Sequence, residues 1–353
     1  MSLNRPSGFY NESYAQEFTI IRTPTQWVFL ALGLIFLFTM PLYSSGYILS
    51  VVNYIGISVL AVYGLHILMG YCGQMTIGQS SFMAVGAYVA AILMIKLGFP
   101  FFLALPCAML ATGVIGLIVG LPSVRVKGFY LVMATLAAQV IIPWMLGHWW
   151  TDVTGGLLGL NVPAIQLMGK PLLEQSEMFF VIWPIALLGT YFAVNIMRSK
   201  TGRALMAVRD NDLAAEVMGV NLFRYKLLAF FICSLYAGAA GALWAVWTRN
   251  LTPENFTLSL SILFMGMLIV GGVGSNAGVF FGVIFMVVFD EIARAVAPGV
   301  GELLNMPQGV MAPALAPLFF GIIVLMFLIF EPRGLAHRWE IFKAYYRLNP
   351  FSY

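Results

Sequence analysis

Charged side chains are scarce in this chain. Lys, Arg, Asp and Glu make up 9% of its 353 residues, whereas 61% are hydrophobic and the mean hydropathy is +0.92. A soluble domain carries about 25% charged residues. The composition therefore excludes a soluble globular protein and predicts a polytopic membrane protein whose parts outside the bilayer are loops and tails.

Cysteine and the sequence patterns of common enzyme sites are also rare or missing. The three cysteines, Cys72, Cys107 and Cys233, are odd in number and lack regular spacing, so we expect neither a disulfide framework nor a metal site. No GxxxxGK[ST], HExxH, CxxC or GxSxG pattern occurs. These absences predict a chain that is not an enzyme, needs no cofactor and carries no ATP site of the GxxxxGK[ST] type.

Long apolar runs, by contrast, are frequent. A helix needs about 17 to 25 apolar residues to cross a bilayer. Gly98 alone separates the third run from the fourth. The candidate spans are 27–43, 47–69, 80–97, 99–120, 128–147, 178–197, 227–247, 258–272, 278–297 and 313–330. The sequence thus predicts an all-α, polytopic transmembrane helical bundle of about ten spans, with a membrane domain over 27–330.

The distribution of Lys and Arg predicts the orientation. If the N-terminus is inside, fourteen of the 18 basic residues fall in inner segments, which is the bias expected of cytoplasmic loops. We therefore expect both termini to be cytoplasmic. The polar segment 1–26 and the tail 331–353 are then cytoplasmic, and 1–26 lacks the pattern of a cleaved signal peptide.

The longest polar interval between two spans, 198–226, is the main candidate for a partner contact. Thr201 is expected to cap a first helix over about 202–209, and Asp210 or Asn211 a second that ends at Gly219. The second helix carries an apolar stripe of Leu213, Ala214, Val217 and Met218. Two interpretations remain open: a helix lying flat on the lipid headgroups, or a docking helix for another subunit.

Glycine interrupts two apolar regions of the chain. The first, Gly70–Gly86, also holds the neutral polar residues Gln74, Thr76, Gln79, Ser80 and Ser81, and a second cluster follows at 271–282. Either interruption can be an ordinary turn with a small-residue packing face, or a broken segment beside a transport path. The candidate hinge or packing glycines are Gly70, Gly73, Gly78, Gly271, Gly272 and Gly274.

Two further regions have alternative readings. The outer loop 148–177 is either a structural hairpin or a surface for an extracytoplasmic partner. In the ninth span, Glu291 and Arg294 lie one helical turn apart, and we expect them to pair with each other rather than to relay protons.

The ordered set of motifs resembles the branched-chain amino acid permease family of ABC importers, and within it the M-type member of the permease pair. The matching stretches are GYCGQMTIGQSSFMAVGAY at 70–88, VRVKGFYLVMATL at 124–136, TDVTGG at 151–156, SKTGRALMAVRDNDLAAEVMGVNLFRYKLLAF at 199–230, AGAAGALWA at 237–245, TPENFTLSLSI at 252–262, GGVGSNAGVFFG at 271–282 and EPRGL at 331–335. They keep the family's order over roughly 47–335.

The resemblance implies a multi-pass inner-membrane (plasma-membrane) subunit. It also implies a second permease subunit in a heterodimer, two cytoplasmic ATPase subunits and an extracytoplasmic (periplasmic) solute-binding protein, with no nucleic acid. The family's coupling segment corresponds to Leu213, Ala214, Ala215, Glu216, Val217, Met218 and Gly219. Candidate path residues are Gln74, Thr76, Gln79, Ser80, Ser81, Thr135 and Gln139.

Two departures from the family pattern bear on the solute. Gln79 stands where members commonly carry His, and Phe129 where they carry an acidic residue. The solute is therefore open between branched-chain amino acids, urea and short amides. A secondary transporter of a small neutral or zwitterionic solute is the alternative function, and a non-transporting membrane scaffold is a third.

Overall fold

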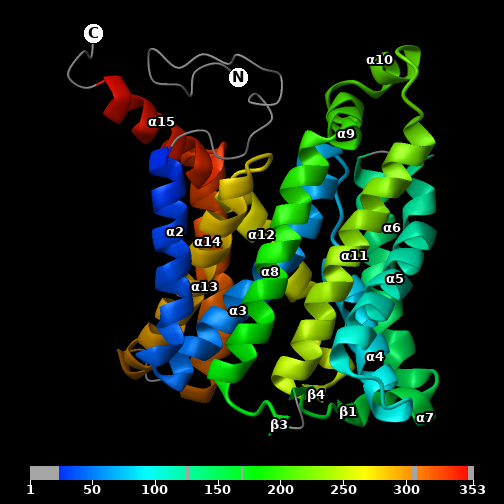
Figure 1. Ribbon diagram of the computed structural model, residues 1–353, viewed down its shortest axis with the longest axis vertical. Coiled ribbons are helices and arrows are strands. Elements are labelled where there is room, and N and C mark those ends of the chain that lie inside the picture. Colours follow the sequence, from blue (N-terminus) through cyan, green and yellow to red (C-terminus); the bar gives the residue numbers. More distant parts are fainter. Residues whose placement is uncertain (1–23, 125–127, 168–169, 304–307, 349–353) are drawn as a thin grey trace.

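The computed structural model of the protein describes residues 24–124, 128–167, 170–303 and 308–348, and these form a bundle of long helices that run roughly side by side (Figure 1). The long elements are α2 (Pro24–Thr39), α3 (Gly46–Leu65), the π-helix η2 (His66–Tyr71), α4 (Gln79–Lys96), α5 (Phe101–Gly120), α6 (Phe129–His148), α8 (Gln175–Arg198), α11 (Leu222–Thr248), α12 (Leu258–Gly271), α13 (Asn276–Leu303) and α14 (Gln308–Phe330). The shorter helices α9 (Lys200–Asp210), α10 (Asp212–Val217) and α15 (Gly334–Leu348) lie at one end.

An α-helix occupies each of the ten predicted apolar runs, and the break at Gly98 separates α4 from α5. Among the described residues, seven helices are long and apolar enough to cross a bilayer. They become eight if Pro317–Phe330 and Gly334–Tyr345, which meet at a 47° bend, form one broken span. The all-α polytopic class is therefore confirmed, whereas the count of about ten spans is not.

The helix α11 lies at the centre of a packed group of helices, where it contacts α3, α4 and α5. Small residues permit the close approach. A Cβ atom at Gly86 would overlap the backbone of Gly238, and one at Gly241 would overlap the carbonyl oxygen of Met83. Helices in a membrane gain little from the hydrophobic effect between them, so such close van der Waals packing stabilises their association.

The end opposite α9 and α10 is tied together by short strands (Figure 1). The strand β1 (Leu160–Asn161) pairs antiparallel with β4 (Asn250–Leu251), and β2 (Gln166–Leu167) pairs with β3 (Lys170–Pro171) to give the outer loop a hairpin. The Arg249 guanidinium donates to the Leu172 carbonyl oxygen at 2.9 Å. These contacts join the loop that follows α6 to the end of α11.

The predicted pairing of Glu291 with Arg294 is wrong. Arg294 pairs instead with Asp290, four residues earlier on α13, at 2.8 Å. Glu291 accepts a hydrogen bond from the Tyr47 hydroxyl of α3. Both spacings bring side chains together on a helix, so the choice between them depends on what the neighbouring helix presents.

Of the two polar terminal segments expected to be cytoplasmic, residues 1–23 and 349–353 lie outside the described part of the chain. The described part of the tail is mostly the helix α15, which follows a turn at Glu331–Arg333. Arg338 on α15 pairs with Glu331 at that turn, which holds α15 against the end of α14.

Candidate functional site

All seven candidate path residues are buried, with 7% or less of their surface exposed: Gln74, Thr76, Gln79, Ser80, Ser81, Thr135 and Gln139. Gln79, Ser80 and Ser81 form the first turn of α4, which begins directly after Gly78. Thr135 and Gln139 lie four residues apart on α6, so they share one face of that helix. The structure therefore brings residues from two distant parts of the sequence into one polar layer.

Gln139 is the centre of this layer. Its side-chain nitrogen donates to Ser80 Oγ at 2.8 Å and to the Phe256 carbonyl oxygen at 3.0 Å. Its side-chain oxygen accepts from the Ser81 backbone nitrogen at 2.9 Å and from Ser261 Oγ at 2.9 Å. Gln139 thus uses both donors and both lone pairs of its amide. The layer joins α4, α6 and the start of α12.

Gln79 extends the polar layer toward the centre of the bundle. Its side-chain nitrogen donates to the Ala61 carbonyl oxygen of α3 at 2.7 Å, and its oxygen accepts from Cys233 Sγ of α11 at 3.3 Å. Thr135 Oγ1 accepts from the Ile77 backbone nitrogen at 3.2 Å. The oxygen Oε1 of Gln74 is buried and, among the described residues, has no hydrogen-bond partner.

Ser261 belongs to the same layer and was not among the predicted path residues. Its hydroxyl donates to Gln139 Oε1 at 2.9 Å and accepts a hydrogen bond from the Ser80 backbone nitrogen at 2.9 Å. The sequence places this serine inside an otherwise apolar run, which is the pattern of a buried, partnered polar group. No fixed charge occurs among the eight residues of the layer, so it suits contact with neutral or zwitterionic groups.

The two glycine clusters, separated by about 200 residues in the sequence, meet in the fold. A Cβ atom at Gly70 would lie 3.2 Å from the Gly274 backbone nitrogen. Gly73, Gly272 and Gly274 adopt φ angles of +71°, +112° and +92°, which side chains other than glycine rarely adopt. Gly70 is the last but one residue of a six-residue π-helical stretch, and such stretches are often found at functional sites.

The remaining candidate glycines have different surroundings. A Cβ atom at Gly271 would overlap the backbone of Gly278, which makes Gly271 a packing position between α12 and α13. Gly78 precedes α4, and a Cβ atom there would lie 3.1 Å from the Thr135 carbonyl oxygen. Packing at Gly271 and Gly78 and turns at the positive-φ positions are the features of an ordinary turn with a small-residue packing face, and a broken segment beside a transport path stays a prediction.

The short helices of the interval 198–226 project from the end of the bundle (Figure 1). The cap of the first differs from the prediction, because Ser199, rather than Thr201, accepts from a backbone nitrogen and α9 begins at Lys200. Asn211 caps α10 as expected, accepting from the Ala214 nitrogen at 3.1 Å. Gly219, with a φ of +87°, ends that helical segment.

The end of α10 has the hydrogen bonds of a Schellman motif. The Val220 nitrogen donates to the Ala215 carbonyl oxygen, and the Gly219 nitrogen donates to that of Glu216, both at 2.9 Å. Nothing lies within 4 Å of a Cβ built at Gly219, so backbone conformation alone favours glycine there.

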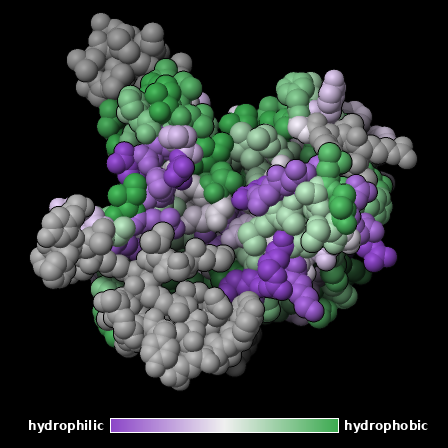
Figure 2. All heavy atoms as spheres, turned by 90° about the horizontal axis from the view of Figure 1, so that it is seen from above, coloured by the Kyte–Doolittle hydropathy of each residue, from purple (hydrophilic) through white to green (hydrophobic). Residues whose placement is uncertain are grey.

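The predicted apolar stripe of α10 is exposed. Leu213, Val217 and Met218 expose 68%, 87% and 84% of their surface, and Ala214 is exposed as well. Within the coupling set, Glu216 is also exposed, whereas Ala215 is buried at 4%. Viewed from this end, apolar and hydrophilic residues lie side by side on the surface (Figure 2).

Lys226 is an exception among the basic residues of this interval. Its surface is 4% exposed, and its ammonium nitrogen lies 3.7 Å from an Asp212 carboxylate oxygen. The pair joins the first turn of α10 to α11 and fixes the return of the chain into the bundle. Lys226 therefore does not contribute to a basic outer surface of the loop.

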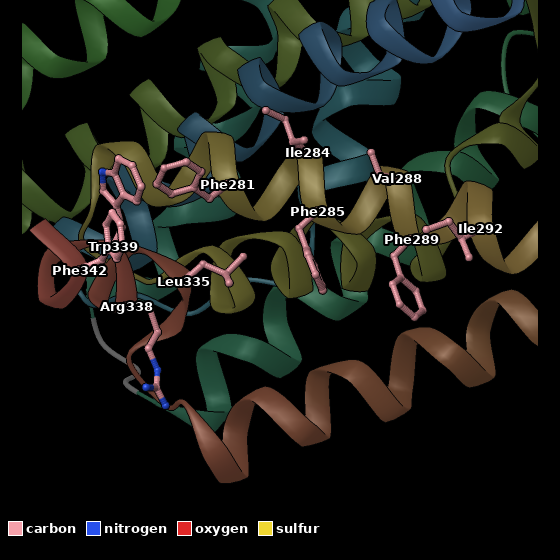
Figure 3. A pocket seen from close by; sticks show the side chains of 10 residues that line it. All are labelled: Phe281, Ile284, Phe285, Val288, Phe289, Ile292, Leu335, Arg338, Trp339 and Phe342. Carbon is pink, nitrogen blue, oxygen red and sulfur yellow. The ribbon is translucent and has the colours of Figure 1, made fainter. Parts of the chain in front are cut away.

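A separate apolar groove of about 670 Å³ lies between α13 and α15 (Figure 3). Six of its lining residues come from α13 and four from α15, and Arg338 is the one charged residue among these ten. The groove shares no residue with the polar layer. It therefore does not extend the candidate path.

Comparison with known proteins gives one family and several relatives. The family described as branched-chain amino acid transport system / permease component matches residues 47–328. The high-affinity branched-chain amino acid transport system permease protein LivM of Salmonella typhimurium is 30% identical over 255 residues, and that of Escherichia coli is 31% identical over 255 residues. Each match covers 65% of this chain and 60% of the relative.

A more distant relative has a different stated solute. The autoinducer 2 import system permease protein LsrC of Enterobacter sp. is 26% identical over 201 residues, which cover 53% of this chain and 56% of that protein. A solved structure, PsaBC from Streptococcus pneumoniae in complex with Fab, aligns with 82% of this chain and 94% of its own at 13% identity and a TM-score of 0.42. That likeness is too low to bear on the fold.

Proposed function

Since the chain belongs to the branched-chain amino acid transport system permease family, we propose that it forms part of the membrane channel of an ABC importer. It is a multi-pass protein of the inner membrane. In this proposal it moves a small zwitterionic or neutral solute inward, and ATP hydrolysis on partner subunits drives the movement. Branched-chain amino acids are the first candidates, because they are the solutes stated for the LivM relatives.

The exposed stripe of α10 is the observation that carries this proposal. Leu213, Val217 and Met218 lie exposed on a helix that is capped at both ends and therefore well formed. Exposed apolar clusters of this kind mark surfaces that meet a partner protein or a membrane. A groove on a cytoplasmic ATPase subunit would bury the stripe, and the exposed Glu216 is available to pair with a basic residue at its rim.

The rest of the assembly follows from the same proposal. Residues 27–330 form the permease domain, 198–226 its cytoplasmic coupling loop, and 1–26 and 331–353 cytoplasmic ends. A second permease subunit completes the channel, two ATPase subunits bind the coupling loops, and an extracytoplasmic binding protein delivers the solute. The Lys and Arg distribution supports this orientation.

The polar layer around Gln139 is the proposed gate of the transport path. In the conformation described, most of its polar groups are hydrogen-bonded within the protein, so a passing solute must replace some of those bonds with its own. Satisfied neutral groups can exchange partners at lower cost than buried charges can. We therefore expect inward transport to open this layer as α4, α6 and α12 move relative to one another.

The two departures from the family pattern differ in their bearing on the solute. Gln79 is buried, and its side chain bonds the Ala61 carbonyl oxygen of α3 and the Cys233 thiol of α11. Phe129, at the start of α6, is 70% exposed. Gln79 is thus the better candidate for a change of solute, and we propose that its neutral amide favours a solute that needs no titratable partner.

Reconstitution tests this function. The chain would be co-expressed with the neighbouring permease, ATPase and binding-protein genes, purified, and placed in proteoliposomes loaded with ATP. We expect labelled leucine, isoleucine or valine to be taken up only with hydrolysable ATP and the binding protein. Uptake by the chain alone, driven by an ion gradient and independent of ATP, would instead establish the secondary transporter.

A further inference from the structure

A side chain of α9 bridges the coupling loop and the glycine turns. Arg209 lies in the last turn of α9, and its Nη1 donates to the Gly70 carbonyl oxygen at 2.7 Å. Gly70 belongs to the end of the π-helix η2, where carbonyl oxygens lack helical partners. A guanidinium is suited to such a helix end, because its charge complements the negative end of the helix dipole.

The same side chain packs on the turn that follows. A Cβ atom at Gly73 would lie 2.7 Å from Arg209 Cγ, which is closer than side-chain carbons approach one another. A Cβ atom at Gly274 would lie 3.6 Å from Arg209 Nη1. Arg209 therefore meets both glycine clusters at the place where they come together. Glycine at position 73 leaves the space that the arginine stem occupies.

The guanidinium is held from the other side by the next residue. Arg209 Nε and Nη2 each lie 3.1 Å from Asp210 Oδ1, so Asp210 restricts the side chain to the conformation that reaches Gly70. The side chain of Arg209 is 40% exposed, so it is attached to the surface of the turns rather than buried within the bundle. Such a contact can be released and remade at moderate cost.

We propose that Arg209 is a positioning residue that transmits movement of the α9–α10 unit to the glycine turns at Gly70–Gly73 and Gly274. This inference rests on the proposed function, because it assumes that an ATPase subunit moves α10. The path is short: α10 follows α9 directly through the Asn211 cap, and α9 ends at Arg209 and Asp210. Beyond Gly73, the chain leads through Thr76 and Gly78 into the polar layer.

The turn that contains Gly73 can respond to such movement. Its glycines adopt conformations with few steric restrictions, so a displacement of the Gly70 carbonyl oxygen changes backbone torsions without breaking side-chain packing. Gly274 lies in the connection between α12 and α13, so Arg209 acts on the start of α4 and on the α12–α13 connection at once. The start of α4 supplies three of the residues that we propose as the gate, and α12 carries a fourth, Ser261, near its other end.

The test is Arg209→Gln in the complete reconstituted importer, with solute imported per ATP hydrolysed as the readout. Arg203→Gln is the matched control, because Arg203 lies on the same helix and its guanidinium donates to the Arg198 carbonyl oxygen within the loop. We expect Arg209→Gln to bind the ATPase and hydrolyse ATP normally but to import about tenfold less solute per ATP, as coupling energies of this kind span about 5- to 150-fold. Arg209→Lys, which keeps the charge but has fewer donors, should lie between.

A second variant perturbs the contact from the opposite side. Gly73→Ala places a methyl group against Arg209 and should lower the import ratio in the same way. Gly98→Ala is its control, because Gly98 has a similar φ of +64° but nothing within 4 Å of its Cβ position. If Gly73→Ala and Gly98→Ala lower the ratio of solute to ATP equally, backbone strain alone explains the loss. That result would overturn the role of the contact between Arg209 and Gly73.

The outcomes separate this inference from the function on which it rests. If the wild-type chain neither binds an ATPase nor couples uptake to ATP, the proposed function and this inference are both overturned. If the wild-type complex is coupled and Arg209→Gln keeps the wild-type ratio of solute to ATP, only the role of Arg209 is overturned. A loss of protein abundance without a change in that ratio would likewise reduce Arg209 to a structural contact.

Discussion

Truncation of the α10 stripe should weaken ATPase binding by an amount that follows from its exposure. Leu213 is 68% exposed and Val217 87%, so most of the surface of each is free to be covered by a partner. Leu213→Ala removes three carbon atoms and Val217→Ala removes two. At about 0.8 kcal/mol per buried CH₂, the losses are about 2.4 and about 1.6 kcal/mol. They correspond to about 50-fold and about 15-fold increases in Kd.

The helix itself should survive these changes. Alanine has the highest helix propensity, and both positions lie within α10, so neither change removes Asn211 or Gly219. A loss of binding would therefore report the missing contacts. The control is Ile341→Ala on α15, which also removes three carbon atoms. Ile341 is 48% exposed, and α15 lies at the same end of the molecule as α10 (Figure 1).

The assay is the affinity of the purified ATPase subunit for the permease in lipid nanodiscs. An environment-sensitive fluorophore at a cysteine introduced at 217 distinguishes the alternative. If the stripe binds headgroups, the fluorophore should already be shielded before the ATPase is added. Unchanged Kd values for both alanine variants, together with such shielding, would refute the docking argument.

Three further outcomes are expected. A single cysteine introduced between 160 and 170 should react with an impermeant maleimide added from outside, and one at 210 should not. The reason is that the basic residues predict a cytoplasmic position for the loop 198–226. The reverse pattern would invert the topology. Gly241→Ala should lower the thermal midpoint of the purified protein, since overpacking costs about 1 to 3 kcal/mol. Gly321→Ala, with nothing within 4 Å of its Cβ position, should leave the midpoint unchanged. Equal midpoints in the two variants would contradict the tight α4–α11 contact. Burial raises the pKa of the Cys72 thiol to about 12. The thiolate fraction and the rate of alkylation should therefore stay low between about pH 7 and about pH 9, and both should rise on unfolding. Fast alkylation of the native protein would show that Cys72 is accessible.

The local features of the coupling loop were largely predictable. The sequence indicated the Asn211 cap, the stop at Gly219 and the exposed stripe, because capping groups and glycine act on their immediate neighbours. It assigned the cap of α9 to Thr201 instead of Ser199, an error of two residues between two hydroxyl side chains that both suit the position. The burial of Lys226 was not predictable, because it depends on the side of α11 that the loop meets.

The burial of the candidate path residues could be foreseen from the sequence, but their partners could not, and their role in transport stays a prediction. Polar residues near Gly70–Gly86 and on the 128–147 run indicated a polar layer, since neutral polar groups inside apolar spans need partners. Which partners they find was open. No local pattern identifies Ser261, Phe256 and Ala61 as the groups that satisfy Gln139 and Gln79.

Composition and periodicity by themselves determined that this chain is a helical membrane protein, where its helices lie and which loop presents an apolar helix. These properties depend on residues within a few turns of one another, so the order of the residues encodes them directly. The tertiary structure alone decided that Arg294 pairs with Asp290, that the two glycine clusters meet, and that Arg209 reaches Gly70. Such contacts depend on which faces of distant helices pack together, and that choice is made by the whole bundle at once.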